Sequence, residues 1–271
     1  MIIDVHTHCF DNVIAKKAIS VLSKKSGIPA HTDGTVSDLI RSMDESHIDI
    51  SVIQPIATKP KQTEVINRWG TSINNERIIS FGTIHPEYPN WKSEIRYLAS
   101  CKVKGIKFHP DYQEFFVDDP KLFPIYEEVF SHNMIALFHA GIDIGLPEPC
   151  HCTPKGLRNI VRTFKGARII AAHMGGCGLW NEVEKYLVGE DIYFDTSYTS
   201  HALDLDFMTR IIKNHGVDQI LFGTDSPWGN QDSEVEFIRS LPLNDEDKDK
   251  ILGKNEINVL GLQLKGLLKR S

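Results

Sequence analysis

The sequence lacks any long apolar run. No uninterrupted apolar stretch in its 271 residues approaches the roughly 20 residues that a membrane-spanning helix needs. It also lacks a charged leader followed by an apolar core, because a short apolar segment begins directly at Ile2. The net charge is −6, and no basic cluster interleaved with aromatic residues occurs. These absences exclude nucleic acid and membranes as partners and predict a cytoplasmic protein.

Cysteine is scarce, with five residues in the chain: Cys9, Cys101, Cys150, Cys152 and Cys177. An odd number in a large chain of this kind predicts free thiols and no disulfide framework. Cys150-His151-Cys152 resembles a pair of metal ligands, but structural zinc usually needs four ligands and no second pair follows. We therefore expect ordinary thiols there.

Strand and helix patterns alternate along the whole chain. The expected strands span residues 2–8, 49–55, 78–86, 103–110, 134–141, 168–176, 191–196 and 219–227. The expected helices span residues 11–25, 35–47, 63–74, 91–100, 121–131, 153–164, 180–187, 203–214, 234–240, 245–252 and 256–265. Several strands are continuous apolar runs, as in parallel strands buried on both faces.

This alternation predicts an α/β fold, a (β/α)8 TIM barrel, as a single domain over residues 1–271. A doubly wound open sheet is the alternative. Such a sheet usually carries a glycine-rich turn after its first strand, and His6-Thr7-His8-Cys9 is unlike one.

Histidines and aspartates gather at the ends of the expected strands, where a barrel of this kind has its active site. His6 and His8 are one residue apart, so alternation on a strand places them on the same face. Any one histidine could be an ordinary hydrogen-bonded residue, but six of the twelve converging with two aspartates indicate a metal site. In chain order the strand ends carry His6 and His8, Gln54, His85, His109, His139, His173, Asp195 and Asp225.

Five motifs give the chain a resemblance to the amidohydrolase superfamily, in its branch of single-metal hydrolases and decarboxylases. They run in order from the first strand to the last: Asp4-Val5-His6-Thr7-His8, Gly105-Ile106-Lys107-Phe108-His109-Pro110, Phe138-His139-Ala140-Gly141, Ala172-His173-Met174-Gly175-Gly176 and Gly223-Thr224-Asp225-Ser226-Pro227. The resemblance implies a distorted TIM barrel with one divalent metal, most often Zn²⁺ and sometimes Mn²⁺. It also implies a homodimer.

By motif position, the resemblance implies that His6, His8, His139 and Asp225 are the metal ligands. It gives Asp225 and His173 catalytic roles, with His173 acting on water or substrate without binding the metal firmly. His109, His85 and Lys107 are candidates for the surroundings of the metal or the substrate. In relatives with two metals a carboxylated lysine bridges them, but at Lys107 such a group would compete with His109 for space.

A metal with three imidazoles and one carboxylate keeps an open position, as catalytic sites do. The first hypothesis is therefore hydrolysis of a C–O or C–N bond in a small lactone, amide or ester by a metal-activated water, with Asp225 moving the proton.

The second hypothesis is non-oxidative decarboxylation of an aromatic or unsaturated acid at nearly the same site. It needs a cation for the substrate carboxylate, and Lys107, Lys59 and Arg158 are the candidates. A third hypothesis, from a different class, is a barrel that binds a ligand without turnover. The complete ligand set counts against it.

Several loop residues are expected near the metal-bearing face. Residues 26–34 and 141–153 are long enough to overhang the mouth of the barrel. Trp180 and Trp228 follow the sixth and eighth strands and could stack on a planar ring, or could anchor loops. Cys9, Cys150, Cys152 and Cys177 fall on the same face, so sensitivity to peroxide or excess zinc binding is a further hypothesis.

Overall fold

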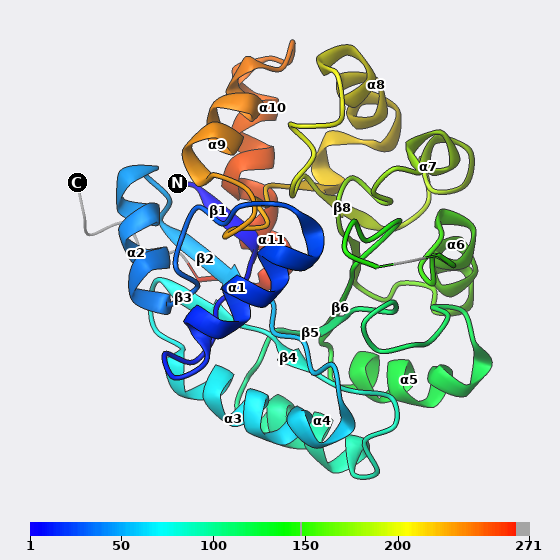
Figure 1. Ribbon diagram of the computed structural model, residues 1–271. Coiled ribbons are helices and arrows are strands. Elements are labelled where there is room, and N and C mark those ends of the chain that lie inside the picture. Colours follow the sequence, from blue (N-terminus) through cyan, green and yellow to red (C-terminus); the bar gives the residue numbers. More distant parts are fainter. Residues whose placement is uncertain (147, 264–271) are drawn as a thin grey trace.

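Parallel strands form a ring in the computed structural model, which describes residues 1–146 and 148–263 (Figure 1). Neighbours in the ring follow chain order, and each ladder is parallel. The strands are β1 (Ile3–Thr7), β2 (Ile50–Ile53), β3 (Ile78–Ser80), β4 (Gly82–Thr83), β5 (Gly105–Phe108), β6 (Ile135–Phe138), β7 (Ile169–Ala171), β8 (Tyr193–Asp195) and β9 (Ile220–Leu221).

Two seams separate the ladders into a sheet of three strands and a sheet of six. At the first seam Phe81 divides the expected third strand into β3 and β4, and its N–H donates to Ile53 O at 2.9 Å. At the second seam Val5 N donates to Phe222 O at 2.9 Å, and Asp225 N donates to His6 O at 2.7 Å. The chain itself therefore crosses the first seam and backbone hydrogen bonds cross the second, and the predicted TIM barrel is confirmed.

Helices surround the ring and mostly match the expected segments (Figure 1). They are α1 (Ala15–Ser26), α2 (Val36–Glu45), α3 (Thr63–Ile73), α4 (Trp91–Ser100), α5 (Phe123–Ser131), α6 (Pro154–Thr163), α7 (Trp180–Tyr186), α8 (Leu205–His215), α9 (Gln231–Ser240), α10 (Asp245–Asp249) and α11 (Asn255–Leu260).

The last three helices differ from the prediction in their ends. Helix α9 begins earlier than expected because the Asn230 side chain accepts a hydrogen bond from Ser233 N and caps it. Helix α10 is shorter, since a π-helical turn at Lys250–Lys254 follows it. Helix α11 ends at Leu260, because Gly261 adopts a left-handed conformation with φ of 60°. The end of the expected helix, at residues 264 and 265, lies outside the described residues.

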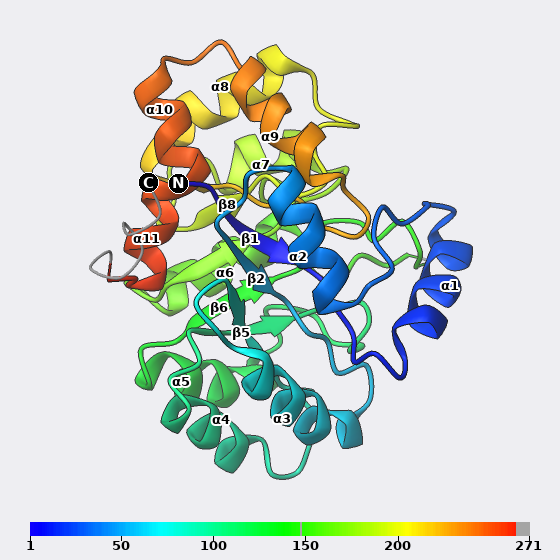
Figure 2. The same cartoon turned by 90° about the vertical axis from the view of Figure 1, so that its left-hand side faces the viewer.

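The core has an inner and an outer part. The inner part joins apolar residues of β1, β2, β6, β7 and β9 with Val259 and Leu260 of α11, and so fills the barrel. The outer part lies between strands and helices. Figure 2 shows α11 at one end of the barrel and α1 at the opposite end, which leaves the α1 end for the site. No helix in the described ranges is long and apolar enough to cross a membrane.

Candidate metal centre and active site

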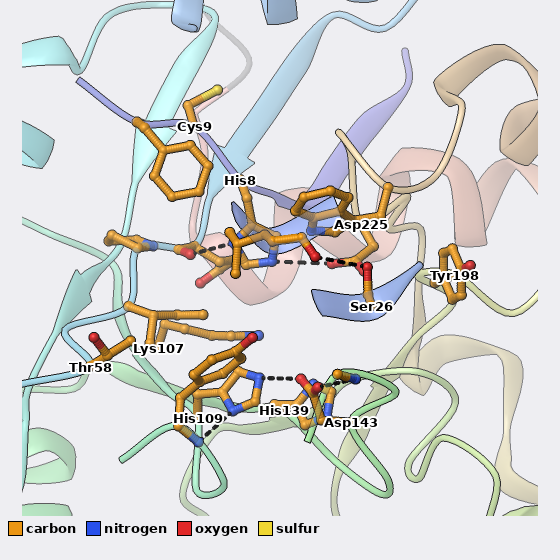
Figure 3. A pocket seen from close by; sticks show the side chains of 18 of the residues that line it. His8, Cys9, Ser26, Thr58, Lys107, His109, His139, Asp143, Tyr198 and Asp225 are labelled. Atoms are coloured by element: carbon orange, nitrogen blue, oxygen red, sulfur yellow. Dashed lines mark hydrogen bonds and ion pairs between the residues drawn. The ribbon is translucent and has the colours of Figure 1, made fainter. Parts of the chain in front are cut away.

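A cavity of about 430 Å³ opens at the end of the barrel under α1. It is lined by residues that follow the strands and by parts of α1 and α3. In the view of Figure 3, His8 and Asp225 lie on one side and His109, His139 and Asp143 on the other, with Lys107 between them. The predicted site residues in the lining are His8, Lys107, His109, His139, His173 and Asp225.

The first group of side chains, group one, consists of His6, His8 and Asp225, whose ligand atoms lie within 4.8 Å of one another. The His8 Nε2 atom is 3.1 Å from Asp225 Oδ1, and His6 Nε2 is 3.5 Å from the same oxygen. The two imidazole centroids are 5.1 Å apart, as expected for neighbours on one face. Three of the four predicted metal ligands therefore meet.

The local backbone is shaped to bring group one together. A Cβ on Gly223 would lie 2.9 Å from the Cβ of His6, so only glycine allows β9 to approach β1 this closely. Asp225 and His173 have positive φ angles of 61° and 58°, a strained conformation that is often found at functional sites. Asp4 accepts hydrogen bonds from Thr224 N and Oγ1 and ties the two strands together.

Hydrogen bonds fix the tautomers of both histidines in group one. His6 Nδ1 lies 2.8 Å from the Asp195 carboxylate and His8 Nδ1 lies 2.8 Å from Gln54 O, so both Nδ1 atoms carry protons. The Nε2 lone pair of each ring is then directed at Asp225. Two acceptors such as His8 Nε2 and Asp225 Oδ1 cannot lie 3.1 Å apart without a proton or a cation between them. This contact is therefore a binding position for a positive charge.

The fourth predicted ligand, His139, has its lone pair exposed in the same manner. His173 Nδ1 donates to Ser197 O at 2.9 Å, which leaves His173 Nε2 to accept from His139 Nδ1 at 3.0 Å. The His139 Nε2 atom is buried and has no hydrogen-bond partner in the described structure. Burial holds the pKa of His139 well below its usual range, so the ring is neutral.

In type these donors suit a single divalent metal, although the structure does not place a His139 nitrogen within 4.8 Å of all three ligand atoms of group one. Neutral imidazole nitrogens and a carboxylate suit Zn²⁺ and Mn²⁺ alike. Burial raises the pKa of Asp225, but the nearby histidines, with His8 Nε2 donating when that ring carries a second proton, outweigh it and hold the pKa below its usual range. Asp225 is therefore an anion. The buried, unpartnered His139 Nε2 is the observation that a metal would explain best.

Lys107 is fully buried beside this site, with its Nζ 3.0 Å from His6 Nε2. Burial lowers the pKa of Lys107 to about 8, opposed by Asp195 and Asp225. No carboxylate of the described residues lies within 4 Å of the ammonium. Because Lys107 donates to the lone pair that a metal would use, it must release His6 when a metal binds.

The second group, group two, consists of His109, His139 and Asp143. The His109 and His139 rings are stacked with centroids 4.1 Å apart. His109 Nδ1 accepts a hydrogen bond from Tyr112 N, so its proton is on Nε2, which lies 3.2 Å from Asp143 Oδ2. A metal on His109 Nε2 would have to displace that proton. The tautomer therefore opposes a metal at group two.

Other predicted residues lie further from the site. His85 does not line the described pocket, because its Nδ1 accepts from Glu87 N in the turn after β4.

Trp180 Nε1 donates to His173 O at 3.0 Å, so it anchors a loop, while Trp228 lines the pocket. Lys59 and Arg158 are outside the pocket lining, so of the three candidate cations only Lys107 lies in the lining that the described residues form.

The five cysteines are free thiols, as expected. Cys9 and Cys177 line the pocket, and Cys150 donates to Gly141 O. No cysteine belongs to a metal-binding group of the described residues. Burial raises the pKa of Cys150 and of Cys177 to about 11, which makes them poor targets for oxidation.

Three further polar side chains shape the site, and of these the sequence indicated only Asp195, as a strand-end residue without an assigned role. Asp195 orients His6, and Ser197 Oγ lies 3.0 Å from Nδ1 of both His6 and His173. Asp143 comes from the loop after β6. Asp195 was recognisable as a strand-end residue, whereas Ser197 and Asp143 carry no local signal in the sequence.

Fold and site together define a TIM-barrel enzyme with a histidine and aspartate centre at the strand ends. The family model described as amidohydrolase matches residues 3–262. The chain belongs to this family. A search of the curated proteins found no match.

Solved structures share the fold at low sequence identity. The chain is similar to 5-carboxyvanillate decarboxylase from Sphingomonas paucimobilis, with 14% identity, a TM-score of 0.74, and coverage of 97% of this chain and 99% of that one. An uncharacterised TIM-barrel protein from Bordetella bronchiseptica has 15% identity, a TM-score of 0.79, and coverage of 96% and 98%. A dihydroxybenzoic acid decarboxylase from Polaromonas, solved with manganese and 2-nitroresorcinol, has 16% identity, a TM-score of 0.74, and coverage of 99% of both chains.

Proposed function

We propose that this protein is a metal-dependent decarboxylase of a small aromatic or unsaturated acid. The observation that carries the proposal is Lys107, a buried ammonium on the pocket floor with no described carboxylate within 4 Å. An unpaired buried charge is costly, and the carboxylate of a bound substrate would supply the missing partner.

Two further features favour an anionic substrate. Helix α1, over the pocket, contains four lysines at positions 16, 17, 24 and 25 and no acidic residue, although the chain has a net charge of −6. Such a local field raises the rate at which anions reach a site. Solved structures that share the fold also include proteins described as decarboxylases. We therefore favour decarboxylation over hydrolysis, although the sequence alone favours hydrolysis.

His6, His8, His139 and Asp225 would hold the metal, which when bound supplies positive charge that polarises substrate oxygen atoms. Lys107 binds and orients the substrate carboxylate. Decarboxylation breaks one C–C bond and leaves its electron pair on carbon, which must then gain a proton. Asp225 is an anion at the floor of the pocket, so it can take a proton from solvent at a carboxylate oxygen and deliver it to that carbon.

His173 acts by position. It donates to Ser197 O and accepts from His139, which keeps the His139 lone pair directed into the site. His139 and His173 are buried, so their hydrogen bonds are stronger than they would be in solvent.

The test is CO₂ release by the protein loaded with Mn²⁺ or Zn²⁺, assayed on hydroxybenzoic and unsaturated acids beside lactones, amides and esters. We expect CO₂ from at least one acid. Hydrolysis of a lactone, amide or ester without any decarboxylation would contradict the proposal. Binding of acids without any turnover would support the third hypothesis, a silent barrel.

Lys107→Met tests whether Lys107 binds the substrate carboxylate. Its control is Lys59→Met, because Lys59 is outside the pocket lining. We expect the first to raise KM for the acid by about a hundredfold, as for one partner lost from a buried ion pair. The control should leave KM unchanged. An equal effect of the two substitutions would argue against carboxylate binding by Lys107.

A further inference from the structure

The walls of the pocket continue as apolar surface beyond its mouth. Nine large apolar side chains are exposed among the described residues: Met1, Val13, Ile14, Val21, Val65, Phe116, Ile142, Ile144 and Leu205. Four of them, Ile14, Val65, Ile142 and Ile144, line this one pocket. Exposed apolar residues scattered singly need no explanation, but a contiguous set around a binding site does.

These four residues come from three separate segments that meet at the mouth. Ile14 precedes α1, Val65 lies on α3, and Ile142 and Ile144 follow β6. Below them, Leu22 of α1 and Trp69 of α3 continue the apolar wall toward the polar floor. Figure 2 shows that α1 stands away from the barrel. The pocket lining combines residues of α1 and α3 with residues that follow the strands.

The candidate metal ligands and the cation of the pocket follow the strand ends. His8, Lys107, His109, His139, His173 and Asp225 line the pocket there, where a carboxylate and neighbouring oxygens would bind. At about 430 Å³ the cavity is in the size range of sites for drug-sized ligands, larger than a single substituted ring requires. The rest of the lining is mostly apolar and also contains Asp11, Ser26 and Thr58.

We infer that the substrate carries an extended apolar portion, an alkyl chain or second ring, that lies against Ile14, Val65 and Ile144 at the mouth while its acid group binds at the floor. The acid group rests on the proposed function. The apolar extension rests on the walls of the pocket and is tested separately from CO₂ release.

The test is calorimetric binding of benzoate, 4-butylbenzoate and 4-octylbenzoate to the Mn²⁺-loaded protein. A fully buried methylene strengthens binding about fourfold. Because the rim is partly exposed, we expect a gain of about tenfold at each of the two extensions in chain length. Equal affinities for the three acids, or no binding of 4-octylbenzoate at millimolar concentration, would overturn the inference.

The rim variant Ile14→Ser/Val65→Ser/Ile144→Ser tests where the chain lies. All three side chains are at least half exposed, at 52%, 71% and 56%, so their loss should not unfold the protein. We expect it to weaken 4-octylbenzoate about tenfold or more while leaving benzoate unchanged. The control Val13→Ser/Val21→Ser removes exposed apolar residues outside the pocket lining and should change neither affinity. Equal losses in the two variants would overturn the inference.

These binding measurements require no turnover. Chain-length dependence without CO₂ release from any acid would support the apolar extension and contradict the decarboxylase. CO₂ release with no chain-length dependence would support the decarboxylase and contradict the apolar extension.

Discussion

Two groups of side chains with similar composition lie on opposite sides of one pocket, and they differ in where their protons are. In group one, the Nδ1 atoms of His6 and His8 donate to Asp195 and Gln54 O, which leaves a lone pair on each Nε2; that of His6 accepts from Lys107. In group two, His109 Nδ1 accepts from the backbone, so its Nε2 donates to Asp143. Residue type alone therefore does not define a metal site, whereas the hydrogen bond at the far ring nitrogen does.

His139 lies close to His109 and Asp143 of group two, but its protonation pattern is that of the histidines in group one. Its Nδ1 donates to His173, and its Nε2 has no partner in the described structure. We therefore propose that His139 binds the metal with His6, His8 and Asp225, and that His109 and Asp143 lie on the substrate side of the pocket.

The largest effect should follow from removing a ligand on one side only. We expect His8→Ala to weaken metal binding by more than the ten- to hundredfold typical of outer partners, because it deletes a nitrogen ligand. His109→Ala should leave metal affinity unchanged within about twofold, since its Nε2 carries a proton. Metal titration of both proteins measures this. A loss of metal from His109→Ala would reverse the assignment of the two groups.

Asp225→Asn should separate metal binding from catalysis. The amide oxygen remains available as a ligand, but the side chain no longer carries a proton to or from the reacting atom. We expect most of the metal to be retained and turnover to fall by about 10² to 10⁴. Metal content and kcat are measured on the same preparation. Near-normal turnover in this variant would remove Asp225 from the mechanism.

A smaller effect on metal affinity should come from the carboxylates that contact the histidines, Asp195 in group one and Asp143 in group two. Asp195→Asn weakens the anchor of His6 Nδ1 at 2.8 Å, so metal affinity should fall about ten- to hundredfold. Asp143→Asn changes the partner of His109 and should leave metal affinity unaltered. Dissociation constants for Mn²⁺ compare the two, and similar losses in both variants would mean that Asp143 also supports the metal.

The smallest effect concerns stability near group one. Burial, with Asp4 and Asp225 nearby, raises the pKa of Glu234 to about 8 from an ordinary 4.5. Its stabilising contribution is therefore complete below pH 4.5 and is lost as the pH rises through 8, since the folded state retains the proton longer than the unfolded state.

Glu234→Gln tests this pH dependence, because the amide retains an oxygen that can accept from Ser200 Oγ. Between pH 5 and 9 the wild-type free energy of unfolding should decline by up to about 4 kcal/mol more than that of the variant. Denaturant unfolding of the metal-free proteins at the two pH values measures the difference. Parallel declines would show that another group is responsible.

Much of the fold could be predicted from the sequence because the spacing of apolar residues indicates which faces of the strands and helices are buried. Continuous apolar runs marked the buried strands, and the spacing of the helices followed. The exceptions are local. Phe81 divides a strand at a seam, and Gly261 ends α11 early because of its left-handed backbone. The capping hydrogen bond of Asn230 moved the start of α9.

Less of the site could be predicted, because its chemistry depends on contacts between distant segments. Motif order brought His6, His8 and Asp225 together, although Asp225 is more than 200 residues from the two histidines. The separation of His109 from the metal depends on a turn that directs Tyr112 N at its Nδ1. Asp143 reaches the pocket from a loop, where periodicity gives no direction for a side chain.

The number of metal atoms bound per chain tests directly whether group one binds metal and group two does not. It is measured after the protein is saturated with Mn²⁺ or Zn²⁺ and freed of excess ion. We expect about one, held by group one together with His139, since His109 Nε2 cannot bind a metal without losing its proton. Two atoms per chain would show that group two also binds metal, and would contradict the assignment on which the mechanism depends.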